Sequence, residues 1–196
     1  MQILSKKRTD SVDSSTPMAS SQVSSLLIDY LDSYYNNDYD ELLILCIGTD
    51  RSTGDCLGPL TGYKLFKYVK SYEKVHVIGT LDEPVHAKNL SLKIDEIKRN
   101  YNNPFIIAID ACLGNLDRIG YISLTLGPLK PGAGVNKSLP SIGDMHITGI
   151  VNLGGFMEYV VLQNTRLNIV MKMSEVISSS FNTALWHLNK NKILNT

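Results

Sequence analysis

Two patterns of apolar positions alternate along the chain and predict a sheet with helices packed on it. Short continuous apolar runs at 42–47, 75–78 and 105–109 are typical of buried parallel strands. Between them, apolar residues recur at three- and four-residue steps and predict helices over 21–34, 55–70 and 90–101. Looser alternation over 119–126 predicts a fourth, partly exposed strand. The same reasoning predicts a helix over 150–161, a fifth strand over 167–171 and a closing helix over 176–188.

This order of strands and helices predicts the α/β class. We expect a three-layer α/β/α arrangement around a mainly parallel, doubly wound sheet. Residues 1–20 are rich in Ser and Thr without an apolar period, so we expect a disordered N-terminal arm. Residues 21–196 are then a single α/β domain. Within it, 127–143 carry repeated Gly and Pro and predict a long loop, a feature that is usually functional in compact domains.

Composition narrows the class of protein. A chain of 196 residues suits one domain, and its longest apolar runs fall short of the ~20 residues of a membrane span. Nineteen basic and nineteen acidic residues give a net charge of +0, so we expect neither a nucleic-acid nor a membrane partner. Three cysteines without paired spacing favour a reduced, cytoplasmic compartment, and no apolar signal-peptide core follows the early basic residues.

Candidate chemistry collects after the predicted strands. In an open α/β sheet, ligands bind outside the carboxyl ends of the strands. The side chains after these strands are Asp50, Arg51, Asp55, Asp82, Glu83, His86 and Asp110, and Asp144 and His146 come after the long loop. Any one of them could cap a helix or lie in the core. Their convergence on one edge favours a functional site, because gathering carboxylates without a task is unfavourable.

Two other chemistries fit the residues less well. The glycine-rich stretch Gly48–Asp55 lacks phosphate-loop and dinucleotide spacing, and Asp55 stands where a phosphate needs a cation. Cys56 and Cys112 lie near the acidic residues, but neighbouring carboxylates raise the pKa of a thiol and disfavour a nucleophile.

Four segments carry a resemblance to a known family: CIGTDRSTGDCLGPLTG (46–62), TLDEPVHAKNL (80–90), FIIAIDACLG (105–114), and the long segment 129–167 containing SIGDMHITGI. Together they resemble the YyaC family of sporulation proteins over most of the chain beyond the arm. That family is related to the germination protease of spore formers and, more distantly, to the hydrogenase maturation endopeptidases. The resemblance implies the phosphorylase/hydrolase-like three-layer fold of those peptidases.

The resemblance also implies roles for three residues. Asp55 in TGDCLGP and Asp110 in AIDAC match the two acidic positions that form a catalytic pair in the germination protease. In the maturation peptidases the matching acids and a histidine, here His146, bind nickel. The chain departs from the pattern at Thr49, where asparagine is usual, and it lacks the extra segments of the full germination protease.

The resulting hypothesis is a cytoplasmic endopeptidase of sporulating bacteria, in the forespore or the mother cell. Asp55 and Asp110 would share a proton and activate water without a cofactor, and His146 would orient one carboxylate. Protein or peptide substrate would contact Asp50, Arg51, Asp82, Glu83, His86, Gly132 and Gly134. One alternative is a peptidase that uses or senses a divalent metal such as Ni or Zn through Asp55, Asp110 and His146. Another is a non-catalytic peptide-binding sporulation protein. The sequence predicts no oligomeric state.

Overall fold

A computed structural model describes residues 8–131 and 139–190. Six strands form one sheet in the order β1-β5-β6-β4-β2-β3 within these residues. The strands are β1 (Thr9–Asp13), β2 (Glu41–Cys46), β3 (Val75–Ile78), β4 (Pro104–Gly114), β5 (Tyr121–Leu126) and β6 (Met145–Leu153). The helices are α1 (Ala19–Tyr34), α2 (Leu57–Val69), α3 (Leu90–Asn100), α4 (Glu158–Gln163) and α5 (Leu167–Lys190), with a 3-10 turn at Leu116–Arg118.

The sheet is mainly parallel and doubly wound, as the sequence predicts. Strands β3, β2, β4 and β6 are parallel neighbours, and only β5 pairs antiparallel with both β1 and β6. From β2 the chain passes through α2 to β3 and then through α3 to β4, on the other side of β2. The strand order therefore reverses at the β2–β4 pair, which is where ligands bind in open α/β sheets.

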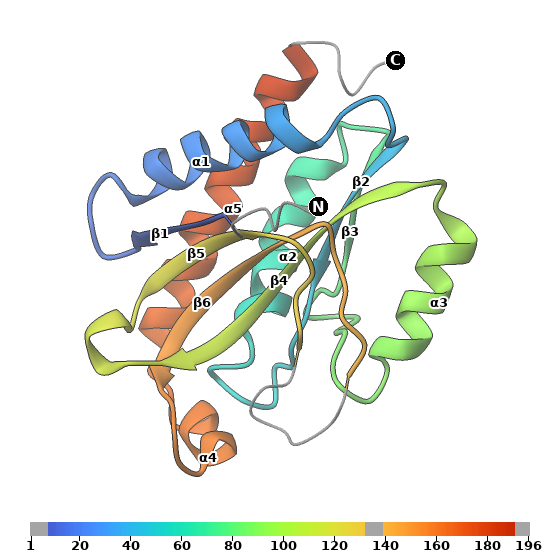
Figure 1. Ribbon diagram of the computed structural model, residues 1–196. Helices are drawn as coiled ribbons and strands as arrows, with labels where there is room; N and C mark the ends of the chain where they lie inside the picture. Colours follow the sequence, from blue (N-terminus) through green and yellow to red (C-terminus); the bar gives the residue numbers. More distant parts are fainter. Residues whose placement is uncertain (1–7, 132–138, 191–196) are drawn as a thin grey trace, which may run out of the picture.

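Helices cover both faces of this sheet (Figure 1). One face packs against α1, α2 and α5 in the larger core, which contains Leu27, Leu57 and Phe181. The other face packs against α3 in a smaller core that includes Leu43, Leu45 and Ile94. The continuous apolar run of β2 is explained by this sandwich, because successive side chains point into opposite cores.

The expected disordered arm is wrong for residues 8–20. Residues Thr9–Asp13 form β1, which pairs with β5 at the edge of the sheet, and α1 begins at Ala19. Polar residues suit an edge strand with one solvated face, and Val12 alone turns into the core with 6% exposure. The absence of an apolar period was therefore a poor sign of disorder. Residues 1–7 lie outside the described ranges.

Two elements of the second half are also corrected. Residues predicted as a helix over 150–161 divide between strand β6, a turn and the short helix α4. The predicted strand over 167–171 is the first part of α5, whose buried residues Val170, Met173 and Ile177 follow helical spacing. A short apolar run fits either structure, and here the continuous 24-residue helix decides it.

Within the described ranges, no helix combines the length and apolar composition that a membrane crossing requires.

Candidate functional site

A cavity of about 410 Å³ opens at the carboxyl ends of the central strands. We call it the site cavity. Its walls come from the loop after β2, the segment after β3, the end of β4, the middle of β6 and helix α4, together with both described ends of the 127–143 loop. The residues most relevant to chemistry are Arg51, Ser52, Asp55, His86, Lys88, Asp110, Cys112, Lys130, Thr148 and Glu158.

Asp55 is positioned by a tight loop that begins at a glycine. Gly48 has φ +139°, and a Cβ placed on it would lie 1.9 Å from the carbonyl oxygen of Asp55. Only glycine allows this approach. The Thr49 N–H donates to the same carbonyl at 3.2 Å, and the Gly54 N–H ties the loop to Leu162 of α4. The backbone of Asp55 is therefore held against the end of β2.

Asp110 lies within β4 rather than after it. The strand continues to Gly114, and Asp110 pairs in register with Thr148 of β6. The side chain is 7% exposed, and its Oδ1 accepts a hydrogen bond from the Ala111 N–H at 2.8 Å. The carboxyl group therefore has little access to water.

The two carboxyl groups have different electrostatic surroundings. Burial, reinforced by the nearby charge of Asp55, raises the pKa of Asp110 well above its usual value, and the Ala111 hydrogen bond opposes this only in part. Burial also raises the pKa of Asp55, but a hydrogen bond from the Thr49 backbone and the nearby His86 both lower it. Asp55 is the half-buried member of the pair and Asp110 the buried one. The pKa of both carboxyl groups is therefore raised, more strongly at Asp110, so Asp110 is the member of the pair that holds a proton more readily.

Two buried polar atoms in the cavity wall have no hydrogen-bond partner among the described residues. They are Ser52 Oγ and His86 Nδ1. Buried polar groups are almost always paired in folded proteins, so unpaired ones require an explanation. Both atoms have almost no accessible surface, so they lie within the wall rather than on the surface of the cavity.

The structure does not bring His146 into this cavity. His146 is the second residue of β6, and its Nδ1 lies 2.8 Å from the carbonyl oxygen of Gly127. It pairs in register with Ala108, roughly 6.6 Å along the strand from the level of Asp110. The expectation that His146 collects at the same edge as Asp55 and Asp110 is wrong, because His146 lies at the beginning of β6. Asp144 accepts a hydrogen bond from the Ile106 N–H, a structural role near the opposite end of β4.

The metal alternative does not fit the residues present. Among residues 8–131 and 139–190, no three His, Cys, Asp or Glu side chains gather closely enough to hold a metal ion. The set of Asp55, Asp110 and His146 is not assembled, because His146 is directed to Gly127.

The structure does not bring the remaining predicted contact residues together. Arg51 and His86 line the site cavity, whereas the exposed Asp50 does not. Asp82 and Glu83 line a second cavity at the edge of the sheet. Gly132 and Gly134 lie outside the described residues.

Thr148 and Lys88 also line the site cavity and were missed. Thr148 carried a usable signal, because β-branched residues are dense over Ile147–Val151 and favour a strand there.

The thiols near the site are not activated. Burial raises the pKa of Cys112 to about 11, and burial together with Asp50 and Asp55 raises the pKa of Cys56. Both thiols are therefore protonated at neutral pH, which agrees with the interpretation that they are packing residues.

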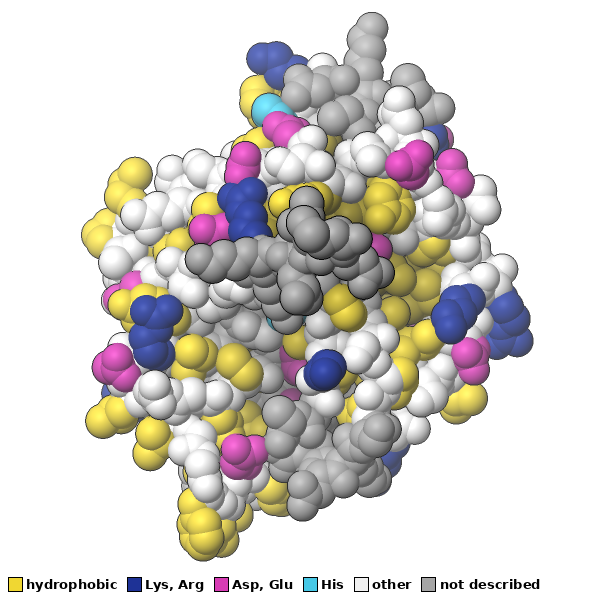
Figure 2. All heavy atoms as spheres, viewed as in Figure 1, with side chains coloured by type: hydrophobic (Ala, Val, Ile, Leu, Met, Phe, Trp, Pro, Cys, Tyr) yellow, Lys and Arg dark blue, Asp and Glu magenta, His cyan; other side chains and the backbone are white. Residues whose placement is uncertain are grey.

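Figure 2 shows acidic and basic side chains interspersed over one face of the molecule, without a large area of one sign. This distribution agrees with the balanced composition.

Comparison with known proteins places the chain in a family. It is 57% identical over 137 residues to the "Uncharacterized protein YyaC" of Bacillus subtilis (strain 168), covering 70% of this chain and 66% of that protein. The chain thus spans slightly less than two thirds of that relative's length. A crystal structure of the [NiFe] hydrogenase maturation protease HycI from Thermococcus kodakarensis KOD1 aligns with a TM-score of 0.49 and 16% identity, covering 82% of this chain and 99% of that one. Residues 12–180 match the family model described as "Protein of unknown function (DUF1256)", and the chain belongs to that family.

Proposed function

We propose that the chain is a hydrolase that cleaves peptide bonds with Asp55 and Asp110 as an acid–base pair. The observation that carries the proposal is the burial of Asp110 beside Asp55 in a cavity at the strand-order reversal. Two neighbouring carboxyl groups whose surroundings set their pKa values apart are an arrangement typical of acid–base catalysis. The resemblance of TGDCLGP and AIDAC to the germination protease supports the same pair of residues.

In this mechanism Asp110 acts as the acid. Burial and the nearby charge of Asp55 raise the pKa of this carboxyl group well above its usual value, which favours its protonated form. That proton can be donated in a hydrogen bond to the carbonyl oxygen of the scissile peptide, where negative charge develops during attack. The Ala111 N–H holds Asp110 Oδ1 in place, so the orientation of the acid is fixed by the backbone of β4.

Asp55 acts as the base. It is the more exposed carboxyl group, and although burial raises its pKa, the Thr49 backbone hydrogen bond and His86 oppose that rise. A water molecule between the two carboxyl groups would lose a proton to Asp55 as its oxygen attacks the carbonyl carbon. The tetrahedral intermediate then expels the amine, which takes the proton from Asp55, and Asp110 regains its own. Protons balance over the cycle without a further reactant.

The walls of the site cavity indicate how a peptide would be held. Ser52 and His86 contribute polar side chains to the lining of the cavity. Ile47, Leu113 and Leu129 contribute apolar wall, which suits uncharged side chains flanking the cleaved bond. A cavity of about 410 Å³ accommodates a short stretch of peptide rather than a folded domain.

The test compares new peptide termini in an unfolded bacterial proteome after incubation with four proteins. These are the unaltered chain, Asp55→Asn, Asp110→Asn and, as the matched control, Asp50→Asn. Asp50 is an exposed carboxylate of the same loop as Asp55 and does not line the site cavity. We expect new termini with the unaltered chain and Asp50→Asn, and at least ~10³-fold slower appearance with the other two variants. No cleavage by the unaltered chain, together with saturable peptide binding that Asp110→Asn retains, would favour a non-catalytic peptide-binding protein.

A further inference from the structure

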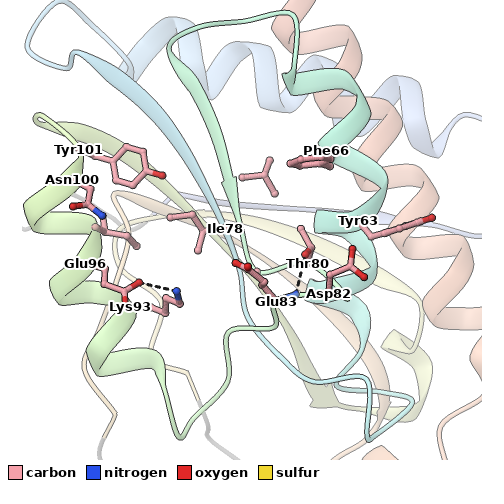
Figure 3. A pocket seen from close by; sticks show the side chains of 13 residues that line it. Tyr63, Phe66, Ile78, Thr80, Asp82, Glu83, Lys93, Glu96, Asn100 and Tyr101 are labelled. Atoms are coloured by element: carbon pink, nitrogen blue, oxygen red, sulfur yellow. Dashed lines mark hydrogen bonds and ion pairs between the residues drawn. The ribbon is translucent and has the colours of Figure 1, made fainter.

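A second cavity, of about 490 Å³, lies at the β3 edge of the sheet between α2 and α3. We call it the edge cavity. Figure 3 shows β3 between the two helices, with Phe66 and Tyr63 on α2, and Lys93, Glu96 and Asn100 on α3, with Tyr101 just beyond its end. The site cavity shares no lining residue with it. The edge cavity is therefore a separate candidate binding place, which the acid–base mechanism does not use.

The floor of this cavity is a strand with unpaired backbone groups. β3 is the last strand of the sheet and pairs only with β2, in parallel, among the described residues. The Leu42 N–H donates to the Lys74 carbonyl at 2.8 Å, so the alternation of a parallel ladder directs the His76 and Ile78 backbone groups toward β2. The N–H and C=O of Val77, which lines the cavity, therefore point away from the sheet. This edge is able to accept another strand.

The negative charge of the edge cavity favours an added strand that carries basic side chains. Asp82, Glu83 and Glu96 face a single ammonium group, that of Lys93, among the described lining residues. Lys93 Nζ lies 2.7 Å from Glu96 Oε2, and this ion pair leaves the exposed Asp82 and Glu83 as the excess negative charge among the lining residues. Outside the lining, Lys70 Nζ lies 4.7 Å from the centroid of the Phe66 ring.

Half-exposed aromatic rings add apolar wall, with Tyr63 at 56% and Phe66 at 49% exposure. Such walls contact the aliphatic stems of lysine and arginine while their charged ends reach carboxylates.

We propose that the edge cavity binds an extended basic peptide segment of another protein, which adds to β3 as a further strand. β-Strand addition takes affinity from backbone hydrogen bonds and specificity from the side-chain pockets on either side. The four residues of β3 span roughly 13 Å and would match a segment of about four to six residues. A second copy of this chain is a poorer occupant, because pairing two β3 edges would bring two acidic cavities together.

The binding test uses a dye-labelled hexapeptide of alternating lysine and valine, measured by fluorescence anisotropy at low salt. The protein carries Asp110→Asn, so cleavage does not interfere and the outcome is independent of the proposed function. We expect saturable binding that the combined Asp82→Asn and Glu83→Gln substitutions weaken about three- to tenfold. Asp95→Asn, which removes an exposed carboxylate of α3 outside the cavity, is the matched control and should leave binding unchanged.

Two further comparisons test the strand addition itself. Val77→Pro removes the outward N–H and should weaken binding at least about tenfold while the fold survives, because proline is tolerated on an edge strand. The same hexapeptide with alternate amides N-methylated avoids any doubt about folding, and it should bind at least about tenfold more weakly. Equal binding of the methylated peptide, or of a glutamate–valine hexapeptide, would overturn the proposal. So would a dimer in sedimentation velocity that Val77→Pro dissociates, because the edge would then serve self-association.

Discussion

The site cavity and the edge cavity are both lined by carboxylates, but these lie at very different depths in the sheet. Asp110 belongs to β4, which β2 and β6 flank, and it is 7% exposed. Asp82 and Glu83 follow β3, the last strand of the sheet, and are exposed. Burial changes the protonation of the first group, whereas water solvates the other two. The same residue types thus suit acid–base chemistry at the centre of the sheet and charge recognition at its edge.

The largest expected effect is on the rate of peptide-bond cleavage, which should depend on the site cavity and not on the edge cavity. Asp110→Asn should lower peptide-bond cleavage at least ~10³-fold, since an amide cannot supply the shared proton. Asp82→Asn should change the cleavage rate by less than about threefold on a short substrate that does not reach β3. The measurement is kcat/KM for both variants on one cleaved peptide identified from the unaltered chain. A loss with Asp82→Asn as large as that with Asp110→Asn would remove the distinction between the cavities.

The pH dependence of stability gives a second contrast. Between the ordinary pKa of an aspartate, about 3.9, and the raised pKa of folded Asp110, the folded state holds a proton that the unfolded state has released. Stability therefore falls as pH rises through this window, by about 1.4 kcal/mol for each unit of raised pKa, and stays low above the folded pKa.

We expect the melting temperature of Asp110→Asn to exceed that of the unaltered chain by an amount that grows as pH rises from about 4. Asp82→Asn, measured over the same range, should show no comparable trend. A melting-temperature difference for Asp110→Asn that is constant with pH would contradict the raised pKa.

Much of the central architecture could be predicted from the sequence, because each of its elements has one dominant signal. The continuous apolar run of β2 indicates burial on both faces, and the three- and four-residue spacing of α3 indicates a helix on one face. The end of the first predicted strand located Asp55, whereas the strand order itself is known only from the structure. Asp110 was found for the same reason, although β4 extends past it.

The elements away from the centre of the sheet could not be predicted, because their hydrophobic and polar residues follow no clear helical or strand period. β1 contributes one buried side chain, Val12, and its pairing with β5 depends on residues more than a hundred positions away. In β6, His146 and Thr148 interrupt the apolar pattern, so the segment lacked a clear period and His146 was assigned to the wrong place. The separation of Asp82 and Glu83 from the site cavity depends on how the segment after β3 turns, which no local pattern encodes.

The opposite edge of the sheet provides a third prediction, because β1 pairs with β5 there, whereas within residues 8–131 and 139–190 no strand pairs with the outer side of β3. Val12→Ala removes buried methyl groups and should lower stability by about 1 to 2 kcal/mol, or several degrees in melting temperature. Thr9→Ser, which removes a methyl group on the exposed side of the same strand, is the control and should change it by less than about 0.5 kcal/mol. Equal melting temperatures for the two variants and the unaltered chain would indicate that β1 contributes little, and that both edges are open to added strands.

The smallest expected effect lies inside the site cavity itself. Cys112 lines it two residues beyond Asp110, and burial raises the pKa of its thiol to about 11. A thiol with this pKa is almost entirely protonated at neutral pH and is a weak nucleophile. Cys112→Ala should therefore leave kcat/KM within about tenfold of the unaltered chain, far above the activity of Asp110→Asn. Cys46→Ala, at a cysteine buried in the larger core, controls for the loss of packing alone. If folded Cys112→Ala were inactive while Cys46→Ala kept full activity, Cys112 would be the nucleophile. The carboxylate mechanism would then be wrong, and the buried Asp110 would be a neighbour of that thiol rather than the catalytic acid.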